Sequence, residues 1–174
     1  YGTYVRMTYQ KTFDAILATP VNIDDLVTGE LMWGASKSLL YGSTIIIVIS
    51  AFGLVESPLI LFVLPVLFIS GLIFAEISVI FTAVVPGIDS FNYFYTLLMT
   101  PMFLFSGIFF PLDNLPSVVS KIAFFTPLYH LVNTCRALAQ GSLKSAQWDI
   151  LWIFLVVIIL APYPFRLMRK RIIK

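Results

Sequence analysis

The chain has 174 residues, of which 59% are hydrophobic and 11% charged, with a mean hydropathy of +0.95 and a net charge of +2. A soluble domain has about 25% charged and 45–50% apolar residues, so this composition excludes an ordinary soluble domain and indicates a chain solvated by lipid. The single cysteine, Cys135, excludes an intrachain disulfide and a cysteine-based metal cluster. Because residue 1 is a tyrosine and no signal-peptide pattern follows, we expect a fragment whose natural N-terminus is missing.

The first predicted elements are two helices separated by a sharp turn, in the stretch QKTFDAILATPVNIDDLVTGEL at residues 10–31. A short helix over residues 12–19 is stopped by Pro20, because proline cannot continue a helix. Asn22 then caps a second helix, with Asp24 and Asp25 in its first turn, where the helix dipole favours anions. The chain is therefore predicted to run as short helix, turn, and long helix entering the membrane.

The short helix carries apolar residues along one side, Phe13, Ile16 and Leu17, and an acid, Asp14, on another. Such a side is suited to the groove of a partner protein. The same pattern also suits an ordinary helix lying at the membrane interface. Periodicity leaves both interpretations open.

Four membrane spans are predicted, because a helix needs about 20 apolar residues to cross the hydrocarbon core. They cover residues 38–55, 59–85, 91–110 and 150–165. The third is dense in aromatic side chains, some of which could line a groove for an acyl chain or sugar rings. An even number of spans places both ends on one side of the membrane.

Lysine and arginine mark the cytoplasmic side. Three lie in the long loop between the third and fourth spans: Lys121, Arg136 and Lys144. Eight lie near the two ends of the chain: Arg6, Lys11, Lys37, Arg166, Arg169, Lys170, Arg171 and Lys174. Both ends are therefore predicted to be cytoplasmic, with residues 166–174 as a basic tail that anchors the last span and attracts anionic lipid. A tail in this position does not indicate nucleic-acid binding.

The loop at residues 111–147 is predicted to form two short helices on the outer side. The first begins near Asn114 and Pro116, and the second runs from Pro127 to Gln140 with Thr126 as its cap and Gly141 as its stop. Its 14 residues reach about 21 Å, less than the roughly 30 Å of a hydrocarbon core. We therefore expect a re-entrant or interfacial hairpin and not a fifth span.

Few residues carry recognisable chemistry. The phosphate-binding pattern G-x-x-x-x-G-K-[ST] is absent from the sequence, so any ATP-driven role requires a partner that hydrolyses the nucleotide. His130 and Cys135 lie about 140° apart around a helix and do not converge, and one His with one Cys does not make a metal site. We expect His130 to donate a hydrogen bond within the hairpin or to face headgroups.

Two charged residues have alternative interpretations. Glu76 lies within a predicted span, where inserting an acid into the membrane costs about 2.5–3.5 kcal/mol. In a functional interpretation it lines a substrate path or pairs with a base across the bundle. In a structural interpretation it snorkels to the membrane surface or caps a neighbouring helix. Arg136 on the outer hairpin binds an anionic headgroup, pairs with Asp113, or is simply solvated. The residues alone leave these alternatives open.

Three blocks of sequence resemble the permease subunits of ABC-2-type exporters. They are YGTYVRMTYQKTFDAILATPV, FNYFYTLLMTPMFLFSGIFFPLDNLP and TPLYHLVNTCRAL, at residues 1–21, 91–116 and 126–138. Their order and spacing make the resemblance specific, and it covers nearly the whole chain. It is strongest for the lipo-oligosaccharide branch, typified by nodulation-factor export permeases.

The resemblance implies an all-α integral membrane protein of six spans, four of them in this fragment, with an outer re-entrant hairpin. It also implies a bacterial inner-membrane location, a second permease copy, and a separate ATP-binding subunit that holds ATP and Mg²⁺, so no cofactor is expected in this chain. The loop before the third span of such permeases carries a coupling helix that docks on the ATP-binding subunit. The positions that match it here are Thr12, Phe13, Asp14, Ile16, Leu17 and Thr19.

Three functional hypotheses follow. The first is a permease subunit that exports a lipo-oligosaccharide, another amphipathic glycan or a lipophilic compound. The second is a membrane-embedded transferase, for which only Asp113, His130 and Arg136 are available at the outer hairpin. The third is a passive scaffold or channel, which would need no coupling helix.

Overall fold

The structure is a computed structural model that describes residues 1–55, 57–109 and 117–173. The described residues are predominantly helical, and no strand occurs among them. The helices are α1 (Gly2–Thr8), α2 (Thr12–Leu17), α3 (Ile23–Ala51), η1 (Pro58–Phe62), α4 (Val63–Val84), α5 (Ser90–Tyr93), η2 (Phe94–Met99), α6 (Thr100–Leu104), α7 (Ser117–Phe124), α8 (Pro127–Ala139), α9 (Leu143–Leu160) and α10 (Pro162–Ile172). The predicted all-α class is confirmed for this part of the chain.

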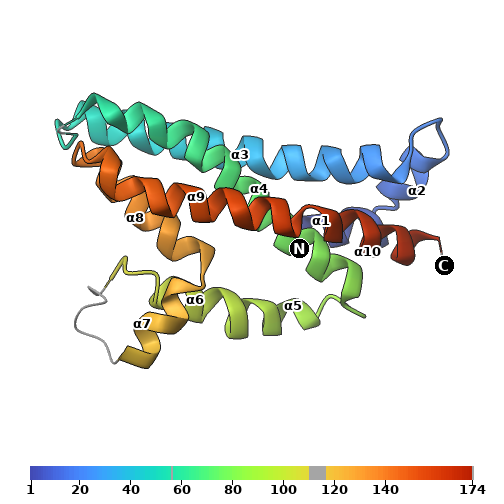
Figure 1. Cartoon of the computed structure of the whole chain (residues 1–174). Helices are drawn as coiled ribbons and strands as arrows, with labels where there is room; N and C mark the ends of the chain where they lie inside the picture. The colour runs from blue at the N-terminus through green and yellow to red at the C-terminus, as the bar shows by residue number, and fades with distance from the viewer. Residues whose placement is uncertain (56, 110–116, 174) are drawn as a thin grey trace.

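The long helices lie side by side (Figure 1). α3 and α4 run antiparallel, and α9 lies along them and continues into α10. The turns between α3 and α4 and between α8 and α9 lie at one end of the bundle, which we call the hairpin end. α2 and the C-terminus lie at the opposite end, which we call the α2 end.

α3 and α4 approach closely along a stripe of small side chains. Ser38 Oγ donates a hydrogen bond to the Leu67 carbonyl at 3.0 Å. A Cβ built on Gly71 would lie 2.6 Å from the Ser38 Cβ, so only glycine fits there. Small residues at four-residue spacing let helix backbones pack tightly inside a membrane. We call this stripe the small-residue seam, formed by Gly34, Ser38 and Gly42 of α3 and Gly71 and Ala75 of α4.

Three helical segments are long and apolar enough to cross a membrane, judged over the described residues: Ile23–Ala51, Pro58–Val84 and Leu143–Ile172. They contain the fourth predicted span and overlap most of the first and second, of which the first, predicted to reach residue 55, ends with its helix at Ala51. The third predicted span, residues 91–110, contains α5, η2 and α6, which follow one another from Ser90 to Leu104 and include a π-helical stretch. This run is shorter than the other three, so the total of four spans stays a prediction.

The helix boundaries predicted from capping signals agree well with the structure. Asn22 precedes α3, and its backbone N–H donates to Asp25 Oδ2 at 3.2 Å, as in a capping box. α8 begins at Pro127 and is followed by Gly141 in the left-handed conformation, with φ of 80°. Thr126 occupies the expected cap position, but its hydroxyl accepts no hydrogen bond from α8 and donates instead to the Ala123 carbonyl at 2.6 Å. The predicted start of the first hairpin helix, at Asn114–Pro116, lies outside the described residues.

Candidate functional site

α2 is held against the bundle by one aromatic side chain. Phe13 is only 2% exposed and packs in a hydrophobic cluster that joins α2 to three longer helices. The buried members contributed by those helices are Leu26, Val27 and Leu31 of α3, Val79 and Ala83 of α4, and Met168 of α10. We call this the α2 cluster. α2 therefore shares one buried hydrophobic cluster with α3, α4 and α10.

The expectation that Phe13, Ile16 and Leu17 form one exposed side is wrong for Phe13. The apolar side of α2 faces the chain's own core, so Phe13 is buried and Leu17 is partly buried. Ile16 lies at the edge of that side and is 37% exposed. The free surface of α2 consists of Asp14, Ala15 and Ile16, and continues to Thr19 beyond the helix end.

The segment around α2 is further held by charged contacts that were not predicted. Arg6 of α1 forms an ion pair with Glu30 of α3, in which Arg6 Nε donates to Oε1 at 3.0 Å. Thr3 donates to Glu30 Oε2 at 2.7 Å. Arg169 of the basic tail donates through Nε to Asp24 Oδ1 at 2.8 Å. α1 and α10 are thereby both attached to the first half of α3, beside α2.

Glu76 lies inside the bundle on α4 and is 3% exposed. Its Oε2 has no hydrogen-bond partner among the described residues. Because the side chain is enclosed, the interpretation in which it snorkels to the membrane surface does not fit this arrangement. A substrate-path role, a pairing with a base across the bundle and the capping of a neighbouring helix stay open for Glu76.

The hairpin is fastened to α9 by a buried histidine. His130 of α8 is 2% exposed; its Nδ1 lies 2.5 Å from Asp149 Oδ1 of α9, and its Nε2 lies 2.7 Å from the Phe124 carbonyl oxygen of α7. The ring stacks on Trp152 with centroids 4.1 Å apart. The Phe124 carbonyl oxygen can only accept, so the Nε2 nitrogen of His130 carries a hydrogen and donates it. His130 thus hydrogen-bonds to a neighbouring element, which is the first of its two expected arrangements, and we call its contact with Asp149 and Phe124 the histidine clasp.

The groups proposed for transferase chemistry are not gathered into a site by the described residues. His130 is engaged in the clasp, and Arg136 Nη2 donates to the Gly107 carbonyl at 2.7 Å, a partner that was not predicted. Asp113 lies outside the described residues. Burial raises the pKa of the Cys135 thiol to about 11, so this thiol is protonated at neutral pH and is a poor nucleophile. No observation here favours the transferase hypothesis.

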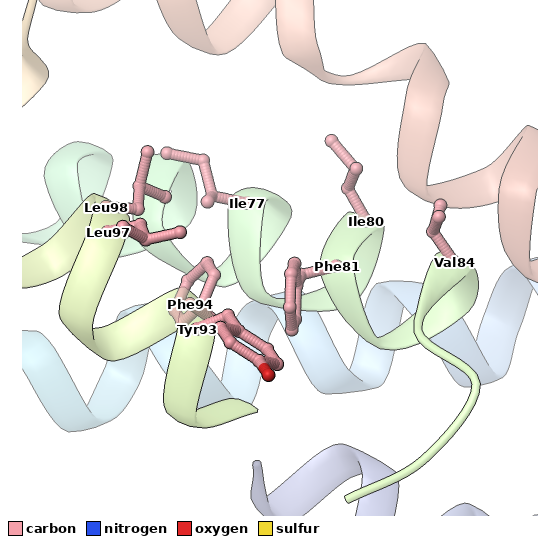
Figure 2. A pocket seen from close by; sticks show the side chains of 8 residues that line it. All are labelled: Ile77, Ile80, Phe81, Val84, Tyr93, Phe94, Leu97 and Leu98. Atoms are coloured by element: carbon pink, nitrogen blue, oxygen red, sulfur yellow. The ribbon is translucent and has the colours of Figure 1, made fainter. Parts of the chain in front are cut away.

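An apolar groove of about 460 Å³ lies between α4 and the α5–η2 segment. Figure 2 shows its lining side chains, which are hydrocarbon except for the Tyr93 hydroxyl. They are Ile77, Ile80, Phe81 and Val84 of α4, Tyr93 of α5, and Phe94, Leu97 and Leu98 of η2. Tyr93 and Phe94 are thus two aromatic residues of the third predicted span that line a groove suited to an apolar chain.

These features define a multi-pass helical membrane protein with an anchored short helix, α2, and a histidine of α8 held between α7 and α9. The chain belongs to the ABC-2 type transporter family, which it matches over residues 3–139. It is 38% identical to nodulation protein J of Sinorhizobium fredii over 136 residues, which cover 78% of this chain and 52% of that protein. It is 39% identical to nodulation protein J of Rhizobium meliloti over 142 residues, covering 82% of this chain and 54% of that protein.

A third relative, nodulation protein J of Bradyrhizobium diazoefficiens, is 34% identical over 136 residues, covering 78% of this chain and 52% of that protein. The chain therefore spans about half the length of the curated relatives it matches. No solved structure matches it. The predicted family resemblance is confirmed by these comparisons.

Proposed function

We propose that this chain forms part of the membrane permease subunit of an ATP-driven exporter, and that α2 is the coupling helix that receives the movement of a separate ATP-binding subunit. The observation that carries the proposal is the division of α2 into two faces. Phe13 fixes one face in the α2 cluster, whereas Asp14, Ala15 and Ile16 are exposed on the other. A small exposed apolar and acidic face on an anchored helix is suited to a groove in a partner.

The packing supplies a route from α2 into the membrane. The α2 cluster joins α2 to α3, α4 and α10, and the small-residue seam binds α3 to α4 along the bundle. A push on α2 therefore moves the long helices together instead of bending a loop. In the proposed mechanism the partner binds ATP and Mg²⁺, and two permease copies open a path between them in the bacterial inner membrane, with both ends of this chain in the cytoplasm.

The proposed cargo is a lipo-oligosaccharide or another compound with a polar and an apolar part. Membership of the ABC-2 type transporter family and similarity to nodulation protein J support this proposal. The apolar groove of α4 and α5–η2 offers a surface for the apolar part.

The Ile16→Arg variant of the full-length protein is expected to lose its ATP-binding subunit. Ile16 is an exposed apolar residue of α2 and would be buried in an interface with the partner. Because a hot-spot residue of an interface contributes about 2 kcal/mol or more to binding, copurification should fall at least about tenfold. The measurement is a mild-detergent pull-down from native membranes with identification of bound proteins by mass spectrometry.

The matched control is Gln10→Arg, which adds the same charge at an exposed position next to α2 but outside it. Thermal unfolding of both variants should equal that of the wild type, because neither position is buried. An ATP-binding subunit that is retained by Ile16→Arg, or that is absent from the intact wild-type protein, would contradict the proposal.

A further inference from the structure

A second groove, of about 290 Å³, lies between α8 and α9 in the hairpin. Its volume is close to the lower end of the roughly 300–1,000 Å³ range of small-molecule sites, so it suits a short segment of a larger ligand. Its lining residues are Asn133, Arg136, Ala137 and Gln140 of α8, with Ser145 and Asp149 of α9. Residues three and four apart lie on the same face of a helix, which is why these two sets face one shared space.

The side chains of this groove are held in place by contacts outside it. Asp149 is fixed by the histidine clasp at 2.5 Å, and Arg136 is fixed by its hydrogen bond to the Gly107 carbonyl at 2.7 Å. Ser145 forms a hydrogen bond with Ser142 at the start of α9. A site whose polar groups are already positioned loses less entropy on binding than a flexible one.

The chemistry of the lining selects a class of ligand. Asn133, Gln140 and Ser145 each offer both a donor and an acceptor, Arg136 offers donors, and Asp149 offers acceptors. The groove carries one charge of each sign, so an anion such as a phosphate meets the Asp149 carboxylate as well as the guanidinium. Hydroxyl groups both donate and accept, and they therefore match this mixture better than an anion or an apolar chain does.

We propose that this hairpin groove binds a neutral oligosaccharide. Its role as the place where the glycan part of a transported compound is held rests on the proposed exporter function. The apolar groove of α4 and α5–η2 is a separate surface, on the half of α4 that contributes to the α2 cluster.

The test uses full-length protein in lipid nanodiscs, titrated with soluble neutral tetrasaccharides built from glucose or from N-acetylglucosamine. The Asn133→Ala, Gln140→Ala double variant should raise the dissociation constant at least about tenfold, since it removes two side-chain amides that hydrogen-bond the sugar. Gln147→Ala, which removes an exposed amide of α9 outside the groove, should bind like the wild type. Saturation-transfer NMR and calorimetry measure the binding, and circular dichroism confirms that each variant is folded.

Three results would overturn the groove proposal. The first is that the wild type binds no tetrasaccharide of the panel, and the second is that the double variant binds as tightly as the wild type. The third is that glycerol phosphate displaces the sugar at equal concentration, which would indicate a lipid headgroup site. Copurification of the ATP-binding subunit, measured on the same samples, reports the exporter function separately. If the protein binds the sugar but no ATP-binding subunit copurifies, the exporter function is contradicted. If the subunit copurifies but no sugar binds, only the groove proposal is contradicted.

Discussion

Replacing Gly71 with valine is expected to separate α3 from α4 and to leave a protein that does not keep its fold in detergent. A Cβ at this position would lie 2.6 Å from the Ser38 Cβ and 2.9 Å from the Ala35 Cα. The Ala35 contact is with backbone, which cannot rotate away as a side chain can. Overpacking a tight core costs about 1–3 kcal/mol and occasionally more, and the loss here should reach about 3 kcal/mol. Fluorescence-detected size-exclusion chromatography after a heating series measures the effect.

The matched control is Gly29→Val on the same helix pair. A Cβ on Gly29 of α3 meets nothing within 4 Å, so the added side chain extends into open space. Both variants replace a helical glycine with the same β-branched residue, and only one of them places it in the seam. Equal heat resistance of the two variants would show that α3 and α4 do not pack as closely as described.

Asp149→Ala is expected to release the hairpin from α9. The change leaves His130, which is 2% exposed, without its carboxylate partner. Leaving a buried polar group without its hydrogen-bond partner costs about 1–3 kcal/mol. Hydrogen–deuterium exchange should rise in α8 and the start of α9, while the α2 cluster at the opposite end keeps its protection.

The informative comparison is the double variant His130→Leu, Asp149→Leu. Replacing both partners by apolar residues removes the uncompensated buried polar group, so the double variant should be more stable than Asp149→Ala alone. A thermodynamic cycle built from the single variants His130→Leu and Asp149→Leu together with this double variant isolates the coupling between the two side chains. If the losses in free energy of unfolding of the two single variants add up to that of the double variant, the two side chains of the clasp do not stabilise the protein as a pair.

Local signals in the sequence predicted where helices begin and end. Pro20 and Asn22 separate α2 from α3, and Pro127 and Gly141 bound α8, because proline and glycine act through the backbone of their own positions. The prediction of a membrane chain likewise follows from composition and from the length of the apolar runs. These features are set by residues that lie close together in the chain, so one sequence is enough to predict them.

Contacts between distant residues were not predictable in the same way. Periodicity predicted the apolar side of α2 but not what this side packs against. Phe13 was therefore assigned to an interface with another protein, although it faces α3, α4 and α10 of its own chain. His130 and Asp149 lie on either side of the Gly141 turn, which was a usable signal for their pairing across an antiparallel helix pair. The spacing Gly34, Ser38, Gly42 was a similar signal for the α3–α4 seam.

The α2 cluster also joins parts of the chain that are made at very different times. Phe13 precedes Met168 by 155 residues (168 minus 13) in the chain, yet both are buried in the same cluster. During biosynthesis α2 therefore waits for α10 to be translated and inserted before its anchoring is complete. A chain that stops before α10 is expected to hold α2 loosely, because Met168 is then missing from the α2 cluster.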